Sequence, residues 1–296
     1  MGFDYELLTC VNPWRFVRCQ GCGHAWLNPR PPATALPVIY PPSYYAYDYA
    51  GKVSPLALRG KGLLDALKFR GILSQLRGRP RMFLDVGCGD GRYLRLMEKQ
   101  GVPRANACGL ELDTRVVARL VAEGYPVYAE RVEDCRRFSE ASFDLVTMFH
   151  VIEHVADPAR VVRRLTSWLR PGGILAVETP NLDSLDARLF SESYWGGYHI
   201  PRHWHVFTSH SLERLLRAAG LEVAGLRYQT GHSFWMYSLH HHLRYGARPR
   251  PRLARHFDPF QGLPLLMLFT AWDTLRAACG LRTSAMLMLA RRPEVG

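Results

Sequence analysis

Short apolar runs alternate with segments of helical spacing over most of the chain. A short apolar run between turn signals is typical of a buried strand, and apolar residues repeated every three to four positions are typical of an amphipathic helix. These patterns predict strands at 81–87, 106–112, 125–130, 143–149, 174–180, 221–229 and 284–292. They predict helices at 63–77, 92–101, 114–124, 157–173 and 211–220.

Strands that alternate with helices imply a mostly parallel sheet covered by helices on both faces. The sequence therefore predicts an α/β protein with a doubly wound sheet. The helix at 157–173 should begin with Asp157 as its N-cap and end at glycines. Residues 1–60 lack this rhythm and are rich in Pro, Tyr and Cys, so they predict a small irregular module and a linker.

The net charge changes this picture only locally. The chain carries 38 basic and 26 acidic residues, a net charge of +12, and most of its arginines are scattered. Scattered arginines are typical of an Arg-rich coding bias, whereas a nucleic-acid binder concentrates its charge on one face. A nucleic acid is therefore not expected as the partner. The exception is one run that contains Arg244, Arg248, Arg250, Arg252 and Arg255.

Two features favour the cytoplasm. The first ten residues lack the basic start and apolar run of a secretory signal, and no stretch reaches the roughly 20 apolar residues that span a bilayer. The seven cysteines are odd in number, and several lie singly in predicted core elements, so they do not suggest a disulfide framework.

The segment FLDVGCGDGRYL (83–94) combines a strand, a glycine turn and the start of a helix. Glycines permit a tight turn and close approach of a ligand, and a helix N-terminus offers free N–H groups. Asp85, before the first glycine, would repel a pyrophosphate and suits a cationic ligand. Glu111 ends the next predicted strand, where a carboxylate can accept both hydroxyls of a ribose. The alternative is a plain strand-to-helix turn.

The motifs LDVGCGDG, GLELD, SFDLVTMFHVIEHVADP and LRPGG follow one another along the chain. Together they resemble the motifs of class I S-adenosylmethionine (SAM)-dependent methyltransferases over about 80–230. The resemblance implies a Rossmann-like, seven-stranded sheet whose last strand is antiparallel and inserted between its neighbours. Residues 284–292 would form that strand. Residues 61–296 would be the methyltransferase domain, with 231–283 as an insertion or lid before the last strand.

The resemblance also implies roles in cofactor binding. Asp85 and the glycine turn would hold the methionine part of SAM. Glu111 would bind the ribose, with Leu112 beside the adenine, and either Glu133 or backbone atoms would contact the adenine amine. The predicted cofactor-binding residues are Asp85, Gly87, Cys88, Gly89, Glu111, Leu112, Glu133 and Phe149.

The segment FHVIEHV spaces His150, Glu153 and His154 at i, i+3 and i+4, which would put them on one face of a helical turn. It is similar to the metal-binding ExxEH pattern of small-RNA 3′-end 2′-O-methyltransferases and ubiquinone-pathway O-methyltransferases. His150 in place of the first acid shifts the preference from Mg²⁺ towards Zn²⁺, Fe²⁺ or Mn²⁺. One prediction is therefore a divalent metal at Glu153 with His150 and His154, and the other is catalysis without a metal.

The segment YHIPRHWH (198–205) contains three histidines. One interpretation is an acceptor-site loop in which a histidine acts as a base or hydrogen-bond donor. A second is a metal shell shared with His150, Glu153 and His154, and a third is a structural loop whose histidines pack or cap. The predicted catalytic residues are His150, His154, His199, His203 and His205.

Cys19 and Cys22 form a CxxC turn, which is half of a typical four-ligand zinc site. Many relatives carry a second CxxC that is absent here, which leaves Cys10 and His24 as further ligand candidates. Bound zinc and a relic turn without metal both fit this pattern.

Residues 263–280 form an apolar helix candidate interrupted by Asp273 and Arg276, and it follows the arginine run. A basic stretch next to an amphipathic helix can lie on an anionic membrane surface. The alternative is a lid helix packed on the core.

These features predict a SAM-dependent methyltransferase that acts on a small-molecule or lipid-linked acceptor, at oxygen rather than at nitrogen or carbon. The alternatives are an RNA methyltransferase and a protein of this fold that binds SAM without transferring a methyl group.

Overall fold

The computed structural model describes residues 1–41, 55–259 and 262–294. Part of the predicted module and linker, residues 42–54, lies outside the described residues. The chain divides into two compact units, each built from three segments. The first unit contains 1–44, 179–212 and 227–287, and the second contains 45–178, 213–226 and 288–296.

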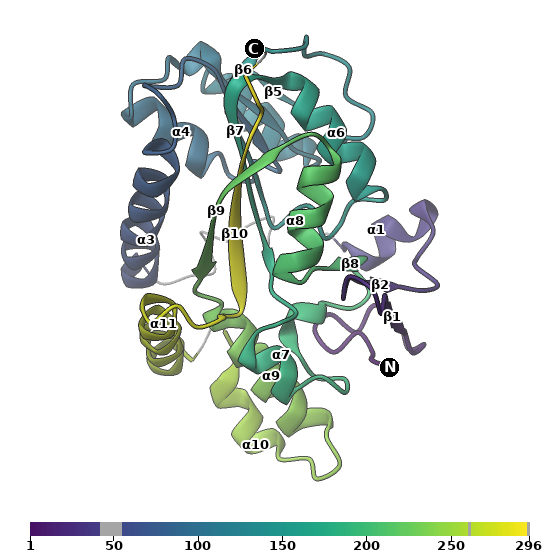
Figure 1. The fold of residues 1–296 in the computed structure, drawn as a ribbon. Helices are drawn as coiled ribbons and strands as arrows, with labels where there is room; N and C mark the ends of the chain where they lie inside the picture. Colours follow the sequence, from purple (N-terminus) through teal and green to yellow (C-terminus); the bar gives the residue numbers. More distant parts are fainter. Residues whose placement is uncertain (42–54, 260–261, 295–296) are drawn as a thin grey trace. The chain divides into compact units, whose positions relative to one another are not determined.

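The larger sheet has seven strands in the order β5-β4-β3-β6-β7-β10-β9. Figure 1 shows β9 and β10 side by side in it. They are β3 (Phe83–Val86), β4 (Ala107–Leu110), β5 (Val127–Tyr128), β6 (Phe143–Phe149), β7 (Leu169–Pro180), β9 (Glu222–Gln229) and β10 (Ala285–Arg291). The first five strands of this order pair in parallel. β3 and β4 are buried throughout, as apolar runs should be in a parallel sheet with two covered faces.

The last strand runs against its neighbour. At one end, Arg292 N donates to Gly173 O and Gly172 N donates to Arg292 O, whereas at the other end Asn181 N donates to Ser284 O. Residue numbers fall along β10 as they rise along β7, so the two strands are antiparallel. β10 also lies between β7 and β9. These findings confirm the predicted seven-stranded, mostly parallel α/β fold.

The longer helices between residues 55 and 218 overlap the helices that amphipathic spacing predicts, but the first of them begins at Pro55 instead of residue 63. They are α3 (Pro55–Leu73), α4 (Arg92–Lys99), α5 (Thr114–Ala122), α6 (Pro158–Trp168) and α8 (Ser209–Ala218). Asp157 caps α6 by accepting a hydrogen bond from Arg160 N at 3.0 Å. The predicted end of this helix at residue 173 is wrong, because the LRPGG segment already belongs to β7. Pairing of Gly172 and Gly173 with Arg292 draws this segment into the sheet.

A smaller antiparallel sheet lies in the first unit. It contains β1 (Phe16–Arg18), β2 (Ala25–Leu27) and β8 (His205–Val206). The sequence predicted only irregular structure here, because strands of two or three residues carry no readable period. β8 begins at His205, the last residue of the YHIPRHWH segment, so the end of this segment pairs with β2 of the N-terminal module.

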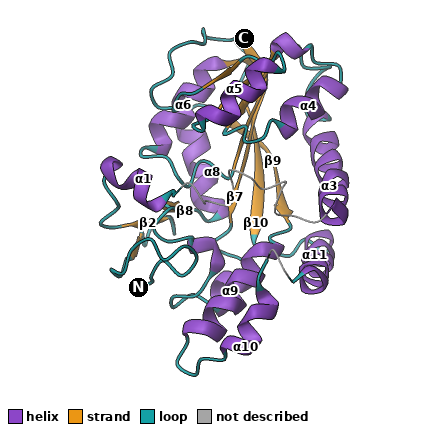
Figure 2. Ribbon diagram, turned by 180° about the vertical axis from the view of Figure 1, so that it is seen from behind, coloured by secondary structure: helices purple, strands orange, loops and turns teal. Residues whose placement is uncertain are grey.

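The described residues of 231–283 contain three helices and a 3₁₀ turn: α9 (His232–Tyr245), α10 (Pro251–Ala254), η5 (Arg255–Phe257) and α11 (Leu263–Ala278). Both α10 and α11 pack against α9 (Figure 2). The remaining short elements are η1 (Ala33–Ala35), α1 (Leu36–Ile39), η3 (Arg104–Asn106), α7 (Leu185–Leu189) and η4 (Gly196–Tyr198). Within the described residues, no helix has the length and apolar character to cross a bilayer. The division into a 1–60 module, a 61–296 domain and a 231–283 insertion stays a prediction.

Candidate active site

The turn between β3 and α4 needs glycine at two positions for different reasons. Gly87 has a φ of +73°, and a Cβ there would lie 2.4 Å from Val151 Cγ2. Gly89 has a φ of +49°, but no heavy atom of the described residues lies within 4 Å of a Cβ built there. The turn therefore packs closely on one side and is open at Gly89, where a ligand can approach the backbone.

Asp85 lies in β3 just before this turn and is buried. Thr147 Oγ1 donates to its Oδ1 at 2.7 Å, while Oδ2 is buried without a hydrogen-bond partner among the described residues. Burial raises the pKa of Asp85 to about 7; the Thr147 hydrogen bond opposes this effect, and the charges of Glu111 and Asp90 add to it. A cationic amine, as in the methionine part of SAM, would supply the missing donor and the missing positive charge. The site therefore fits this group.

Glu111 follows β4 and lies against the glycine turn. Gly89 N donates to its Oε2 at 2.9 Å, and the backbone N–H groups of Leu112 and Asp113 donate to its Oε1 at 2.6 and 3.1 Å. The carboxylate thus joins the two strand ends where a ribose would be bound. The Leu112 side chain is 62% exposed, as an apolar contact for a planar base requires.

The other predicted cofactor residues are more enclosed. Cys88 and Phe149 are buried. Glu133 accepts hydrogen bonds from Arg131 at 2.9 Å and from Ala156 N at 3.1 Å. Burial alone would raise the pKa of Glu133, but these donors hold it below its usual range. Its carboxylate already has partners, and its contact with adenine stays a prediction.

His150 directly follows β6 and is held between two carboxylates. Its Nδ1 lies 3.3 Å from Glu153 Oε1, and its Nε2 lies 3.4 Å from Glu178 Oε1. Its backbone has a φ of +53°, which non-glycine residues seldom adopt, and its N–H donates to Glu178 O at 2.8 Å. Desolvation lowers the pKa of His150, but the two carboxylates outweigh this and raise it to about 9. The site therefore holds an imidazolium whose side chain is 43% exposed.

The helical turn predicted for residues 150–154 is wrong. This segment is a non-helical turn, because the left-handed backbone of His150 is incompatible with an α-helix. His150 and Glu153 still meet, by a different route. Glu153 and His154 also offer ligand atoms that lie within 4.8 Å of each other. A metal at His150, Glu153 and His154 stays a prediction.

Glu178 connects His150 to a buried chain of charges that the sequence analysis missed. Lys68 Nζ lies 2.5 Å from Glu178 Oε2 and 3.8 Å from Asp65 Oδ1, and Asp65 Oδ2 lies 2.5 Å from Arg92 Nε. Burial would raise the pKa of Glu178, but Lys68 and His150 hold it well below its usual range. A signal existed: Glu178 lies near the carboxyl end of the predicted strand 174–180, His150 follows the predicted strand 143–149, and the carboxyl ends of parallel strands share an edge.

Arg202 anchors the YHIPRHWH segment within the first unit. Its guanidinium is fully buried and forms a two-bond ion pair with Asp4, at 3.0 and 2.9 Å. It also donates to Ile39 O at 2.7 Å. Burial would raise the pKa of Asp4, but Arg202 lowers it to about 2. This arginine therefore has a structural role that its position in the sequence did not reveal.

Two of the loop histidines have defined partners. His199 Nδ1 lies 2.8 Å from Glu6 Oε2, with both side chains buried. His203 Nδ1 lies 2.8 Å from Gly197 O, so this nitrogen carries the proton, because a carbonyl only accepts. The catalytic role of both histidines stays a prediction.

The third loop histidine pairs with the N-terminal module. His205 Nδ1 lies 3.1 Å from His24 Nε2, and burial lowers the pKa of His24 to about 4. Cys10 Sγ accepts a hydrogen bond from Trp14 Nε1. In the part of the chain that the structure describes, no close group of three potential metal ligands includes Cys19 or Cys22. Zinc at these cysteines and catalysis by His205 stay predictions.

Comparisons with known proteins identify the family of this chain. A family profile described as a methyltransferase domain matches residues 59–226. The ubiquinone biosynthesis O-methyltransferase of Neisseria meningitidis serogroup C (strain 053442) is 31% identical over 169 residues, which are 54% of this chain and 70% of that protein. The protein of the same name from Xanthomonas campestris pv. campestris (strain B100) is 32% identical over 200 residues, covering 62% and 79%.

Two solved structures share the fold at low sequence identity. A chain from the Haloferax volcanii complex between the Trm112 methyltransferase activator and a methyltransferase has a TM-score of 0.52 and 17% identity, covering 84% of this chain and 96% of that one. A structure from Galdieria sulphuraria, titled as a sarcosine dimethylglycine methyltransferase, has a TM-score of 0.51 and 18% identity, covering 80% and 86%. The profile, the curated relatives and the observed sheet together show that the chain belongs to the methyltransferase domain family and is a class I SAM-dependent methyltransferase.

Proposed function

We propose that this enzyme transfers a methyl group from SAM to an oxygen atom of a small-molecule acceptor. The observation that carries the proposal is His150, held at the carboxyl end of β6 between Glu153 and Glu178 and partly exposed. The names of the two curated relatives, both O-methyltransferases of ubiquinone biosynthesis, support a small-molecule acceptor and do not favour RNA.

Asp85 and Glu111 would hold the cofactor. The buried Oδ2 of Asp85 would accept a hydrogen bond from the ammonium group, and Glu111 would accept the ribose hydroxyls beside the open backbone of Gly89. When bound, SAM supplies a methyl group on a positively charged sulfur. Because methyl transfer is an in-line displacement, fixing both reactants supplies much of the acceleration.

His150 would accept the proton that the acceptor hydroxyl loses. Glu153 and Glu178 would stabilise the imidazolium that results, as a carboxylate does for a catalytic histidine in other enzymes. The exposed part of the ring could then release the proton to solvent. Because the pKa of His150 is about 9, only a small neutral fraction exists at pH 7, and turnover should rise with pH up to about 9.

The experiment combines a cofactor measurement with an acceptor screen. Calorimetry should show binding of SAM and of its demethylated product, and labelled SAM should report transfer to a panel of phenols, alcohols and amines. His150→Gln should lower turnover on an oxygen acceptor by roughly 10²–10⁴-fold with little change in SAM affinity. His210→Gln, at an exposed position on α8, is the matched control.

Two results would contradict this proposal. Transfer only to nitrogen or carbon acceptors would exclude oxygen as the target. Elemental analysis that finds a stoichiometric ion, together with loss of activity on chelation, would favour the metal prediction at His150, Glu153 and His154.

A further inference from the structure

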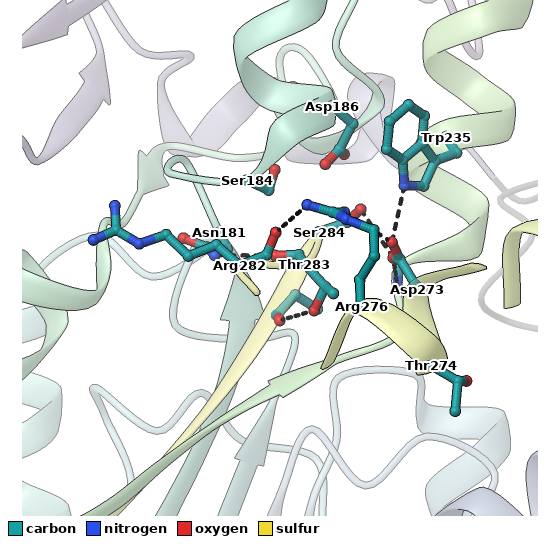
Figure 3. A network of polar contacts seen from close by, with 12 residues as sticks. Asn181, Ser184, Asp186, Trp235, Asp273, Thr274, Arg276, Arg282, Thr283 and Ser284 are labelled. Atoms are coloured by element: carbon teal, nitrogen blue, oxygen red, sulfur yellow. Dashed lines mark hydrogen bonds and ion pairs between the residues drawn. The ribbon is translucent and has the colours of Figure 1, made fainter. Parts of the chain in front are cut away.

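The charged residues of α11 face the protein interior. Its two charged side chains, Asp273 and Arg276, are both buried. Trp235 Nε1 donates to Asp273 Oδ1 at 3.1 Å and Gly231 N donates to Oδ2 at 3.0 Å, while Arg276 donates to Arg282 O at 2.7 Å. Figure 3 shows these groups converging from α9, α11 and the segment before β10. This network fixes the rotation of α11 about its own axis.

The apolar face of α11 consequently points outward. Its exposed side chains include Met267 (55% exposed), Leu268 (60%), Trp272 (45%) and Leu275 (61%). The spacing of 268, 272 and 275 places them along one side of the helix. Since both charged residues of α11 are buried, this exposed face is uncharged. An uncharged apolar stripe of this kind marks an interaction surface.

A basic segment lies on the same helical insertion. Residues 244–255 contain five arginines and no acidic residue, and all five arginines are exposed. They lie in and around α10, which packs against α9 as α11 does. Within the described residues 1–41, 55–259 and 262–294, these arginines form no ion pair. The insertion thus combines one exposed apolar helix face with a concentrated positive charge.

We propose that α11 and the 244–255 segment form a surface that docks on an anionic lipid bilayer. A run of arginines with no acidic residue among them matches lipid phosphates better than the mixed charges of a protein surface, and the apolar stripe matches the acyl boundary. With 16 residues, α11 is about 24 Å long, and it would lie in the plane of the interface. The proposal does not depend on the identity of the methyl acceptor.

Vesicle flotation of the full chain tests this surface. The protein should bind vesicles of phosphatidylglycerol and phosphatidylcholine at low salt, bind pure phosphatidylcholine vesicles weakly, and leave the anionic vesicles at high salt. The variant Leu268→Ser/Leu275→Ser should bind anionic vesicles roughly 10-fold or more weakly for each leucine. Leu189→Ser, which changes a leucine that is 63% exposed on α7, is the matched control.

The charge contribution needs its own variant. Arg248→Gln/Arg250→Gln/Arg252→Gln should weaken binding on the order of 100-fold, since each arginine near an anionic surface contributes about fivefold. Lipids with brominated acyl chains should quench the fluorescence of Trp272. The contribution of Trp272 is the difference between the quenching of the wild type and that of Trp272→Phe. SAM affinity should be unchanged in every variant, which shows that they fold.

Three results would overturn the proposal. The first is no vesicle binding by the wild type at low salt. The second is wild-type binding by the double-leucine variant. The third is a wild-type dimer that the double-leucine variant dissociates while neither protein binds vesicles, because a second copy of the chain would then cover the face.

Discussion

Replacing Glu178 by Gln should lower the pKa of His150 and shift the pH dependence of turnover. The change keeps the side-chain shape but removes a negative charge 3.4 Å from His150 Nε2. Two unit charges at this distance interact with about 1 kcal/mol in water and about 5 kcal/mol at an effective dielectric constant of about 20. Because His150 is 43% exposed, solvent screening keeps the loss near about 2 kcal/mol. The pKa should therefore fall from about 9 to between about 7 and 8.

The assay measures turnover at saturating SAM and acceptor between about pH 6 and pH 10. An NMR titration follows the protonation of His150 over the same range, and the signal of this residue is identified by its absence in His150→Gln. If His150 accepts the acceptor proton, the midpoint of the rate profile and the NMR midpoint should both move down by the same amount. In Glu178→Gln, Lys68 Nζ still lies 3.8 Å from Asp65 Oδ1, so the variant does not leave Lys68 as an unpaired buried charge. Glu213→Gln, which removes an exposed pair with Arg217 on α8, should change neither midpoint. A lower NMR midpoint with an unchanged rate profile would refute the role of His150 as the base.

Asp85→Asn should weaken SAM binding by roughly 10- to 100-fold at pH 8, and calorimetry should show that only the wild-type affinity rises as the pH passes about 7. Glu111→Ala should weaken SAM binding by about 1–3 kcal/mol in calorimetry, because the ribose hydroxyls lose their acceptor; unchanged affinity in a folded variant would contradict the assigned site. Arg202→Met should destabilise the fold by about 3–5 kcal/mol in urea, since Asp4 stays buried without its partner, and adding Asp4→Leu should recover part of the loss. Because the pKa of Asp4 is lowered to about 2, its ionised carboxylate stabilises the fold above about pH 4. The free energy of unfolding should fall as the pH drops through about 2, and acid denaturation should show this loss.

Local chemistry was enough to predict most of the large sheet and its cofactor turn. β6 lies on the predicted apolar run 143–149, because a strand buried on both faces has little freedom to be polar. Gly87 was predicted as part of a tight turn, and its positive φ confirms that expectation. These features depend on neighbours in sequence, so their signal is present in the sequence itself.

Features that depend on distant residues could not be predicted in the same way. The rotation of α11 is set by Trp235 and Gly231, which lie on another element and select the charged face of the helix as the inner one. The apolar pattern alone would favour the opposite rotation. The structural role of Arg202 likewise depends on Asp4, which lies 198 residues away in the sequence. A motif search assigns a residue to its own segment and therefore misses such partners.

The HxxEH motif shows that the spacing of residues alone does not identify a metal site. The balance of charges around these residues must be considered as well. Carboxylates that surround a histidine can stabilise either a metal ion or an imidazolium, since both are cations. A metal ligand must be a neutral imidazole, yet Glu153 and Glu178 raise the pKa of His150 to about 9, so the proton competes with a metal at neutral pH. Lys68 adds a further positive charge on Glu178, which lowers the attraction of the site for a second cation. A proton therefore balances these carboxylates with less excess charge than a divalent ion would, and this charge balance is the reason for proposing a base at His150.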